Sequence, residues 1–159
     1  MHDKLVASAT AMLVVSALLT SCLPDYFPRR KLKVNLSGAD MAGNWKLTTS
    51  SAKILTLVYH VSIKPNESAI EFFADGRCEL RDFIGEDEDV HSGAATWKIE
   101  QDSLEPKASV LHISYRTPER PVTFSLSFTR RHRKIILWQY HGDPDSREYV
   151  EYERVLPNA

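Results

Sequence analysis

Hydrophobic and polar residues alternate along most of the chain from Gly43 onward, and turn residues interrupt the alternation at short intervals. A period of two is typical of antiparallel β-strands that bury one face. The pattern predicts about eight or nine strands, at residues 43–49, 54–62, 69–74, 77–84, 94–101, 109–116, 121–130, 134–140 and 147–155. Many short strands must close or stack to protect their edges. We therefore expect an all-β, antiparallel up-and-down barrel, with a sandwich as the alternative.

The side chains that face the interior follow from the same alternation. The clearest element is a hairpin over residues 69–83 that turns at Asp75-Gly76. Segment 54–62 is ambiguous, because its apolar residues also fit one face of a short helix. The residues predicted to point inward are Ile70, Phe72, Cys78, Leu80, Trp97, Ile99, Leu111, Ile113, Tyr115, Val122, Phe124, Leu126, Phe128, Ile136, Trp138 and Tyr140.

The N-terminus has the layout of a secretory signal peptide, because an uncharged apolar stretch at residues 5–19 follows Lys4. The stretch ends in Leu19-Thr20-Ser21-Cys22, which resembles the lipobox of bacterial lipoproteins. The resemblance implies that residues 1–21 are removed and that acylated Cys22 anchors the protein to a membrane. The residue after the cysteine is Leu23, as in lipoproteins of the outer membrane that face the periplasm, whereas lipoproteins retained at the inner membrane resemble one another in having Asp there. The alternative is a transmembrane helix, because the uncharged run is just long enough to cross a bilayer.

Residues 22–39 join this segment to the predicted strands. They contain two prolines and the basic cluster Arg29-Arg30-Lys31, so we expect a tether whose cations can contact anionic lipid headgroups. If Cys22 is acylated, Cys78 has no partner for a disulfide. We therefore expect Cys78 to be a small buried hydrophobic residue rather than a reactive thiol.

The sequence Gly43-Asn44-Trp45 at the start of the first strand resembles the Gly-x-Trp entrance of the lipocalins and their bacterial relatives, and the resemblance extends over residues 40–156. In that family the tryptophan closes the floor of the barrel, and a basic residue at the end of the last strand packs across its ring. The resemblance implies these roles for Trp45 and Arg154. The alternative for Arg154 is that it ends the strand with its charge in water.

The charge balance adds little, since 20 Lys and Arg face 21 Asp and Glu for a net charge of −1. Such a chain has no general affinity for nucleic acid. It contains no nucleophile elbow, zinc motif, phosphate loop, dinucleotide fingerprint or Cys-x-x-Cys pair. We therefore expect no cofactor and no enzymatic activity.

Three charged segments remain as candidates for recognition. The acidic run 86–89 before His91, and Asp143 and Asp145 after His141, suit a divalent cation if the loops meet, but we expect a solvated loop and a turn and predict no metal site. The basic segment 130–134 is expected to be a charged hairpin tip, with lipid phosphates or an acidic partner as the alternative.

Two functions fit these expectations. In the first, a lipid-anchored envelope protein binds a small apolar ligand inside a lipocalin-like barrel. The residues predicted to line that ligand are Phe72, Trp97, Tyr115, Phe124 and Trp138. In the second, these bulky side chains fill the barrel, and the protein is an interaction module of the inhibitor or immunity type. Its partner would then be an envelope protein bound by the acidic loop 85–91 or the basic tip 129–134.

Overall fold

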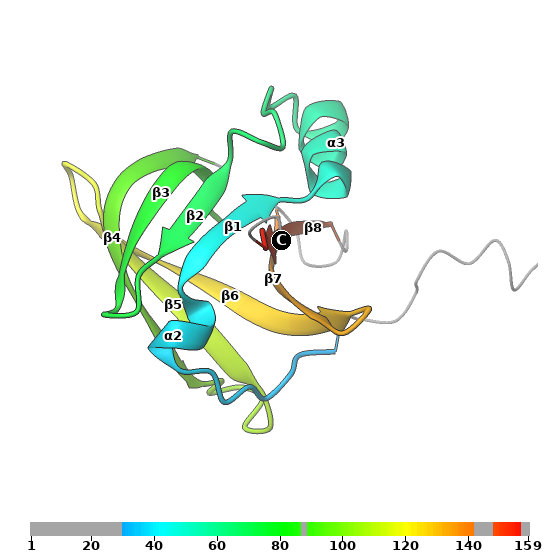
Figure 1. Ribbon diagram of the computed structural model, residues 1–159. Helices are drawn as coiled ribbons and strands as arrows, with labels where there is room; N and C mark the ends of the chain where they lie inside the picture. The colour runs from blue at the N-terminus through cyan, green and yellow to red at the C-terminus, as the bar shows by residue number, and fades with distance from the viewer. Residues whose placement is uncertain (1–29, 87–88, 142–147, 157–159) are drawn as a thin grey trace, which may run out of the picture.

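The computed structural model describes residues 30–86, 89–141 and 148–156, and it shows a closed barrel of eight antiparallel strands (Figure 1). The strands are β1 (Gly43–Leu47), β2 (Ala69–Phe72), β3 (Arg77–Ile84), β4 (Val90–Gln101), β5 (Ser109–Arg116), β6 (Pro121–Arg131), β7 (Lys134–Tyr140) and β8 (Tyr149–Arg154). Each strand pairs with the next along the chain, and β8 pairs with β1 to close the barrel. The predicted all-β up-and-down barrel is confirmed.

Two short helices lie outside the barrel wall, α2 (Gly38–Met41) where the chain enters β1 and α3 (Thr49–Val58) where it leaves β1 (Figure 1). α3 replaces the strand predicted over 54–62, so that prediction was wrong. The helix begins because the Thr48 side chain accepts a hydrogen bond from the backbone N–H of Ser51. Ala52 and Leu55 then bury one helical face against the core, which is the alternative that the apolar spacing left open.

The interior of the barrel is a continuous hydrophobic core. The inward faces predicted for β2 to β6 are confirmed, with Trp97, Ile99, Tyr115 and Val122 only partly buried at the margins. The buried members of the core are Met41, Trp45, Leu47, Ala52, Leu55, Ile70, Phe72, Cys78, Leu80, Phe83, Ile84, Ala95, Leu111, Ile113, Phe124, Leu126, Phe128, Leu137, Val150 and Tyr152.

The predicted face of β7 was wrong. Leu137 lies directly between Phe128 of β6 and Tyr152 of β8 in the ladder and belongs to the core. Because side chains alternate along a strand, Trp138 and its neighbours Ile136 and Tyr140 point to the outer side of the barrel. Both faces of β7 are largely buried, so its composition does not reveal which face is inside.

The segment before α2 belongs to the folded domain rather than to a free tether. The backbone N–H of Leu32 donates to the Phe128 carbonyl at 2.9 Å, and the Leu32 carbonyl accepts from the Ser109 N–H at 2.9 Å. Leu32, Val34 and Leu36 pack against the core at alternate positions. The segment therefore covers the end of the barrel between β5 and β6 (Figure 1).

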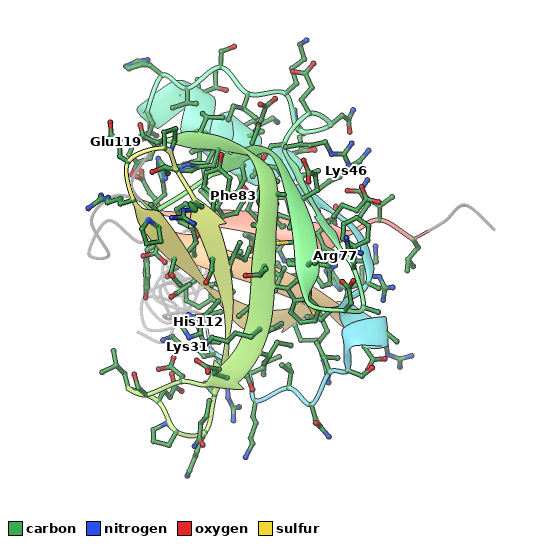
Figure 2. The ribbon with its side chains drawn as sticks, turned by 90° about the vertical axis from the view of Figure 1, so that its left-hand side faces the viewer. Lys31, Lys46, Arg77, Phe83, His112 and Glu119 are labelled. Atoms are coloured by element: carbon green, nitrogen blue, oxygen red, sulfur yellow. The ribbon has the colours of Figure 1, made fainter. Side chains whose placement is uncertain are left out.

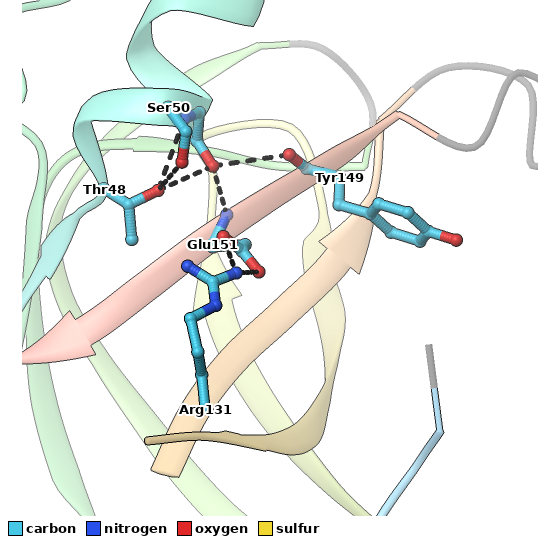
Figure 3. A network of polar contacts seen from close by, with 6 residues as sticks. Thr48, Ser50, Arg131, Tyr149 and Glu151 are labelled. Atoms are coloured by element: carbon cyan, nitrogen blue, oxygen red, sulfur yellow. Dashed lines mark hydrogen bonds and ion pairs between the residues drawn. The ribbon is translucent and has the colours of Figure 1, made fainter. Parts of the chain in front are cut away.

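A polar network ties α3 to the last strand (Figure 3). Ser51 Oγ accepts a hydrogen bond from the Glu151 N–H at 2.9 Å, and the Thr48 N–H donates to the Glu151 carbonyl at 2.9 Å. The Glu151 carboxylate, with only 2% of the residue exposed, accepts two hydrogen bonds from Arg131 Nη2 at 2.6 and 2.8 Å. Arg131, one of the residues of the basic tip, therefore has a structural role.

Within the part of the chain that the structure describes, no helix is long and apolar enough to cross a membrane. Cys22, the lipobox-like sequence and the predicted signal peptide lie outside the described residues. Cys78 is 2% exposed, which confirms the prediction of a buried residue. Burial, with a smaller contribution from Glu79, raises the pKa of its thiol to about 12.

Candidate functional site

The five residues predicted to line an internal ligand do not surround one cavity. Phe72 and Phe124 are each 1% exposed within the core. The Phe72 ring meets the ring of Trp45 edge-on, with centroids 6.2 Å apart, and the Phe124 ring lies 5.1 Å from that of Phe83. Phe83 in turn stacks on Tyr152 at 5.5 Å. Aromatic rings from several strands therefore fill the middle of the barrel.

Trp97 and Tyr115 are held by hydrogen bonds to the wall of the barrel. The Trp97 indole N–H donates to the carbonyls of Phe73 and Arg77, at 3.1 and 2.9 Å, so the ring fastens β4 to the β2–β3 hairpin. The Tyr115 hydroxyl donates to the Ser92 carbonyl at 2.7 Å. Both side chains thus have structural contacts that use their polar atoms.

The residues predicted to close the base of the barrel are brought together. Trp45 is 2% exposed and lies directly opposite Arg154 in the β1–β8 ladder. Gly43 has a φ of 127°, and a Cβ there would lie 3.4 Å from Arg154 Nε. Glycine is therefore favoured at this position both by the left-handed backbone and by the proximity of the guanidinium group.

A groove of about 560 Å³ lies on the outer side of the barrel over β5, β6 and β7. Its size is in the range of small-molecule binding sites. Figure 2 shows two of its residues, His112 and Lys31, on the same side of the molecule. The groove is lined by Lys31, Glu86, Glu100, Gln101, Asp102, Ser103, Leu104, Val110, His112, Ser125, Ser127, Trp138, Gln139 and Tyr140.

The groove includes the place where β6 and β7 separate. Their pairing runs only from Arg131↔Lys134 to Ser127↔Trp138. Beyond that point the backbone N–H of Ser125 donates to the Glu86 carboxylate at 3.2 Å instead of to β7. A side chain from the β3–β4 loop thus takes the position of a strand partner. The hydrogen-bonded ladder between β6 and β7 is therefore interrupted beside the groove.

Two buried polar atoms of groove residues lack hydrogen-bond partners. They are Nε1 of Trp138 and Oε1 of Gln139, on residues that are 1% and 2% exposed. The other end of the Gln139 amide is satisfied, since Nε2 donates to the Ile84 carbonyl at 2.5 Å. An unpaired buried polar group costs about 1–3 kcal/mol, so such groups are rare in native proteins and each calls for a partner.

Negative charge dominates the groove. It contains the carboxylates Glu86, Glu100 and Asp102, against the single ammonium group of Lys31. A hydrogen bond from Lys98 lowers the pKa of Glu100, whose carboxylate lies 3.6 Å from His112 Nε2. A hydrogen bond from Lys31 at 2.7 Å lowers the pKa of Asp102. These carboxylates are therefore ionised at neutral pH and disfavour an anionic ligand.

Only part of this site could be predicted from the sequence. Trp138 was a candidate, but for the interior, and Gln139, His112 and Ser125 were not candidates. The available signal was a glutamine in the middle of the apolar strand 134–140, where an inward amide needs a partner.

The charged loops are only partly described. Residues 87–88 of the acidic run, and Asp143 and Asp145, lie outside the described residues. Among the described residues, no three His, Cys, Asp or Glu side chains are grouped so that they could hold a metal ion.

Comparison with known proteins identifies no relative. No protein-family model matches the chain, and no curated protein or solved structure is significantly similar to it.

Proposed function

We propose that this protein is a lipid-anchored module of the bacterial cell envelope that recognises its ligand on the outside of a solid barrel. The proposed binding site is the groove over β5, β6 and β7. The anchor is supported by the lipobox-like sequence that ends at Cys22, with the outer membrane as its proposed location. Two or more acyl chains would hold the protein stably at a membrane. The barrel is lipocalin-like, as the positions of Gly43, Trp45 and Arg154 support.

One observation favours the groove over the barrel interior as the ligand-binding site. The rings of Phe72, Phe83 and Phe124 pack against other aromatic rings inside the barrel. The groove, in contrast, contains the unpartnered indole N–H of Trp138, which lies on the outer side of β7. A small apolar molecule, the first expectation from the sequence, would leave this donor unpaired.

The chemistry of the groove narrows the ligand class. Trp138 Nε1 needs an acceptor, the carboxylates of the groove accept from donors, and a hydroxyl or amide group offers both. The carboxylates repel an anion, while a simple cation would leave the indole N–H unpaired. The ligand that fits best is a small neutral molecule that carries several hydroxyl or amide groups.

The binding site is tested by native mass spectrometry of the acylated protein purified from its source. We expect a neutral polar molecule to remain bound to the wild type and to be lost from Ser125→Trp, which fills the groove. Ser114→Trp is the matched control, because Ser114 is exposed on β5 and does not line the groove. His112→Trp provides a second variant if Ser125→Trp folds poorly. Equal retention by the groove and control variants would contradict the site.

The anchor is tested separately with Cys22→Ala. We expect this variant to lose metabolic labelling by palmitate and to remain an uncleaved precursor. Unchanged acyl labelling and membrane fractionation would rule out the lipid anchor and leave the groove proposal intact.

A further inference from the structure

We propose that one end of the barrel docks directly on an anionic phospholipid bilayer. The surface, called here the basic base, consists of Arg30, Arg130, His132, Arg133, Lys134, Val155 and Leu156. The orientation of this surface toward the membrane rests on the proposed lipid anchor. Its affinity for anionic lipid does not.

The fold brings the chain entrance next to the β6–β7 hairpin. The hydrogen bond from the Leu32 N–H to the Phe128 carbonyl places the chain entrance, which begins at Arg30, alongside the end of β6 that leads to Arg130. Figure 1 shows the start of the described chain next to the β6–β7 turn. Two basic segments that are far apart in the sequence therefore form one surface.

The position of this entrance fixes which end of the barrel is near the membrane. Only residues 23–29 separate Cys22 from Arg30. Even fully extended, this stretch spans about 25–30 Å, since each residue covers at most about 3.3–3.6 Å. An acylated Cys22 would therefore hold the basic base close to the lipid headgroups. A rotation of the domain would then be enough to bring this surface into contact with them.

The cations of the basic base are available for an external partner. No ion pair joins Arg30, Arg130, Arg133 or Lys134 to any residue that the structure describes. Arg131, in the same hairpin, behaves differently because Glu151 binds its guanidinium group. In this hairpin Arg131 stabilises the fold, whereas Arg130, Arg133 and Lys134 are exposed to solvent.

Apolar side chains accompany these cations. Val155 is 41% exposed and Leu156 is 62% exposed, directly after β8. A cavity of about 320 Å³, large enough for a phosphate headgroup, is lined by the basic residues Arg133, Lys134 and Arg154, against the single acidic residue Asp40, and by Leu156. Basic residues that bind phosphates beside apolar residues that enter the headgroup layer are the pattern of interfacial membrane binding.

The turn of the hairpin has an unfavourable backbone for its residues. His132 and Arg133 have φ values of 48° and 68°, in the left-handed region. Two-residue turns of this kind favour Asn-Gly, which adopts these angles at much lower cost. Histidine is among the residue types enriched at such angles, but the turn itself does not favour the arginine at position 133.

The test uses the mature chain, residues 22–159, with Cys22→Ser, so that no acyl chain contributes to binding. Co-flotation is measured with vesicles of phosphatidylglycerol and phosphatidylcholine at 30:70, and with vesicles of phosphatidylcholine alone. We expect binding to the anionic vesicles only, and at least tenfold weaker binding when salt rises from about 0.05 to 0.5 M, because salt screens the charges.

The matched variants remove three positive charges each. Arg130→Gln/Arg133→Gln/Lys134→Gln is expected to bind the anionic vesicles at least tenfold more weakly. Lys53→Gln/Arg116→Gln/Arg120→Gln, with its exposed residues on α3 and around the β5–β6 turn, is expected to bind within twofold of the parent chain. His132→Asn/Arg133→Gly relieves the turn and is expected to weaken binding without loss of folding.

Three results would overturn the proposal. The first is equal binding to neutral and anionic vesicles. The second is an equal loss of binding in the two triple variants. The third is wild-type binding by the variant with the hairpin charges removed. Because this chain is not acylated, each result is independent of whether Cys22 carries lipid.

Discussion

Trp45 and Arg154, directly opposite each other in the β1–β8 ladder, together bind the carbonyls of three consecutive residues at the end of α2. The Trp45 indole N–H donates to Met41 at 3.0 Å. The Arg154 guanidinium donates to Asp40 at 2.8 Å and to Ala42 at 2.5 Å. A short helix exposes its last carbonyls, and these two side chains satisfy them. They thereby fasten the chain entrance to the strand that closes the barrel.

This arrangement predicts that Trp45 and Arg154 are energetically coupled. Trp45→Phe removes the hydrogen bond to the Met41 carbonyl. Arg154→Ala removes the hydrogen bonds to the carbonyls of Asp40 and Ala42. Each variant is expected to lower the free energy of unfolding by about 1–3 kcal/mol. Because both side chains hold the same segment, a double-mutant cycle by urea denaturation should give a coupling above about 0.5 kcal/mol. Simple additivity would show that the two contacts act independently.

The resemblance to lipocalins anticipated the partners but not the full chemistry of their contact. It placed Arg154 across the ring of Trp45, and the structure makes them cross-strand neighbours. The hydrogen bonds to the α2 carbonyls were not foreseen, because residues 22–39 were interpreted as a tether. A segment that satisfies backbone groups across the fold carries no local periodicity from which that role can be predicted.

The ion pair between Arg131 and Glu151 gives a second prediction. Glu151 is buried beneath Arg131, whose side chain is 44% exposed. Arg131→Gln is expected to lower the free energy of unfolding by about 1–3 kcal/mol at neutral pH, because it removes two charge-assisted hydrogen bonds from a buried carboxylate. Glu151→Gln in the same chain should restore part of that loss. An Arg131→Gln variant as stable as the wild type in thermal and urea unfolding would contradict a structural role.

Acid should release the segment before α2. The hydrogen bond from Lys31 lowers the pKa of Asp102 in the folded protein, so this contact stabilises the fold above the unfolded pKa of about 3.9 and is lost as the pH falls below it. Lys31→Gln should therefore cost about 1–2 kcal/mol at pH 7, and progressively less as the pH falls through the lowered pKa of Asp102. Urea denaturation at pH 7 and at a series of acidic pH values checks this. A difference that does not change with pH would contradict the role of the Asp102 charge.

The buried thiol of Cys78 should be unreactive in the folded protein. With its pKa raised to about 12, almost none of it is thiolate at pH 8. In a chain of residues 22–159 with Cys22→Ser, we expect a thiol reagent such as 5,5′-dithiobis(2-nitrobenzoate) to modify no cysteine until the protein is unfolded in urea. Immediate modification of the folded chain would show that Cys78 is accessible.

The strands were predictable because burial of one face imposes a strict period of two. The inward positions of Phe72, Phe124 and Phe128 follow from that period, and the hairpin follows from the turn residues Asp75-Gly76. Segment 54–62 failed because a short apolar run fits a helix as well as a strand, and only the Thr48 cap and the contact of Leu55 with the core decide between them.

The candidate site was much less predictable. In β7, Trp138 and Leu137 are both almost fully buried, so hydrophobicity does not reveal that the tryptophan lies outside. The groove also depends on where β6 and β7 stop pairing and on Glu86 from another loop, which binds the Ser125 N–H. Such contacts arise from the closed barrel as a whole, and no motif in the chain encodes them.

The most direct test of a solid barrel is a titration of the unacylated mature chain with a fluorescent fatty-acid probe. The wild type and Phe124→Ala, which opens a space in the core, are compared. We predict that the wild type shows no saturable binding of the probe. If either protein binds the probe, it should be Phe124→Ala. Stoichiometric binding to the wild type that is abolished by Phe124→Trp would show a hollow interior and contradict the account.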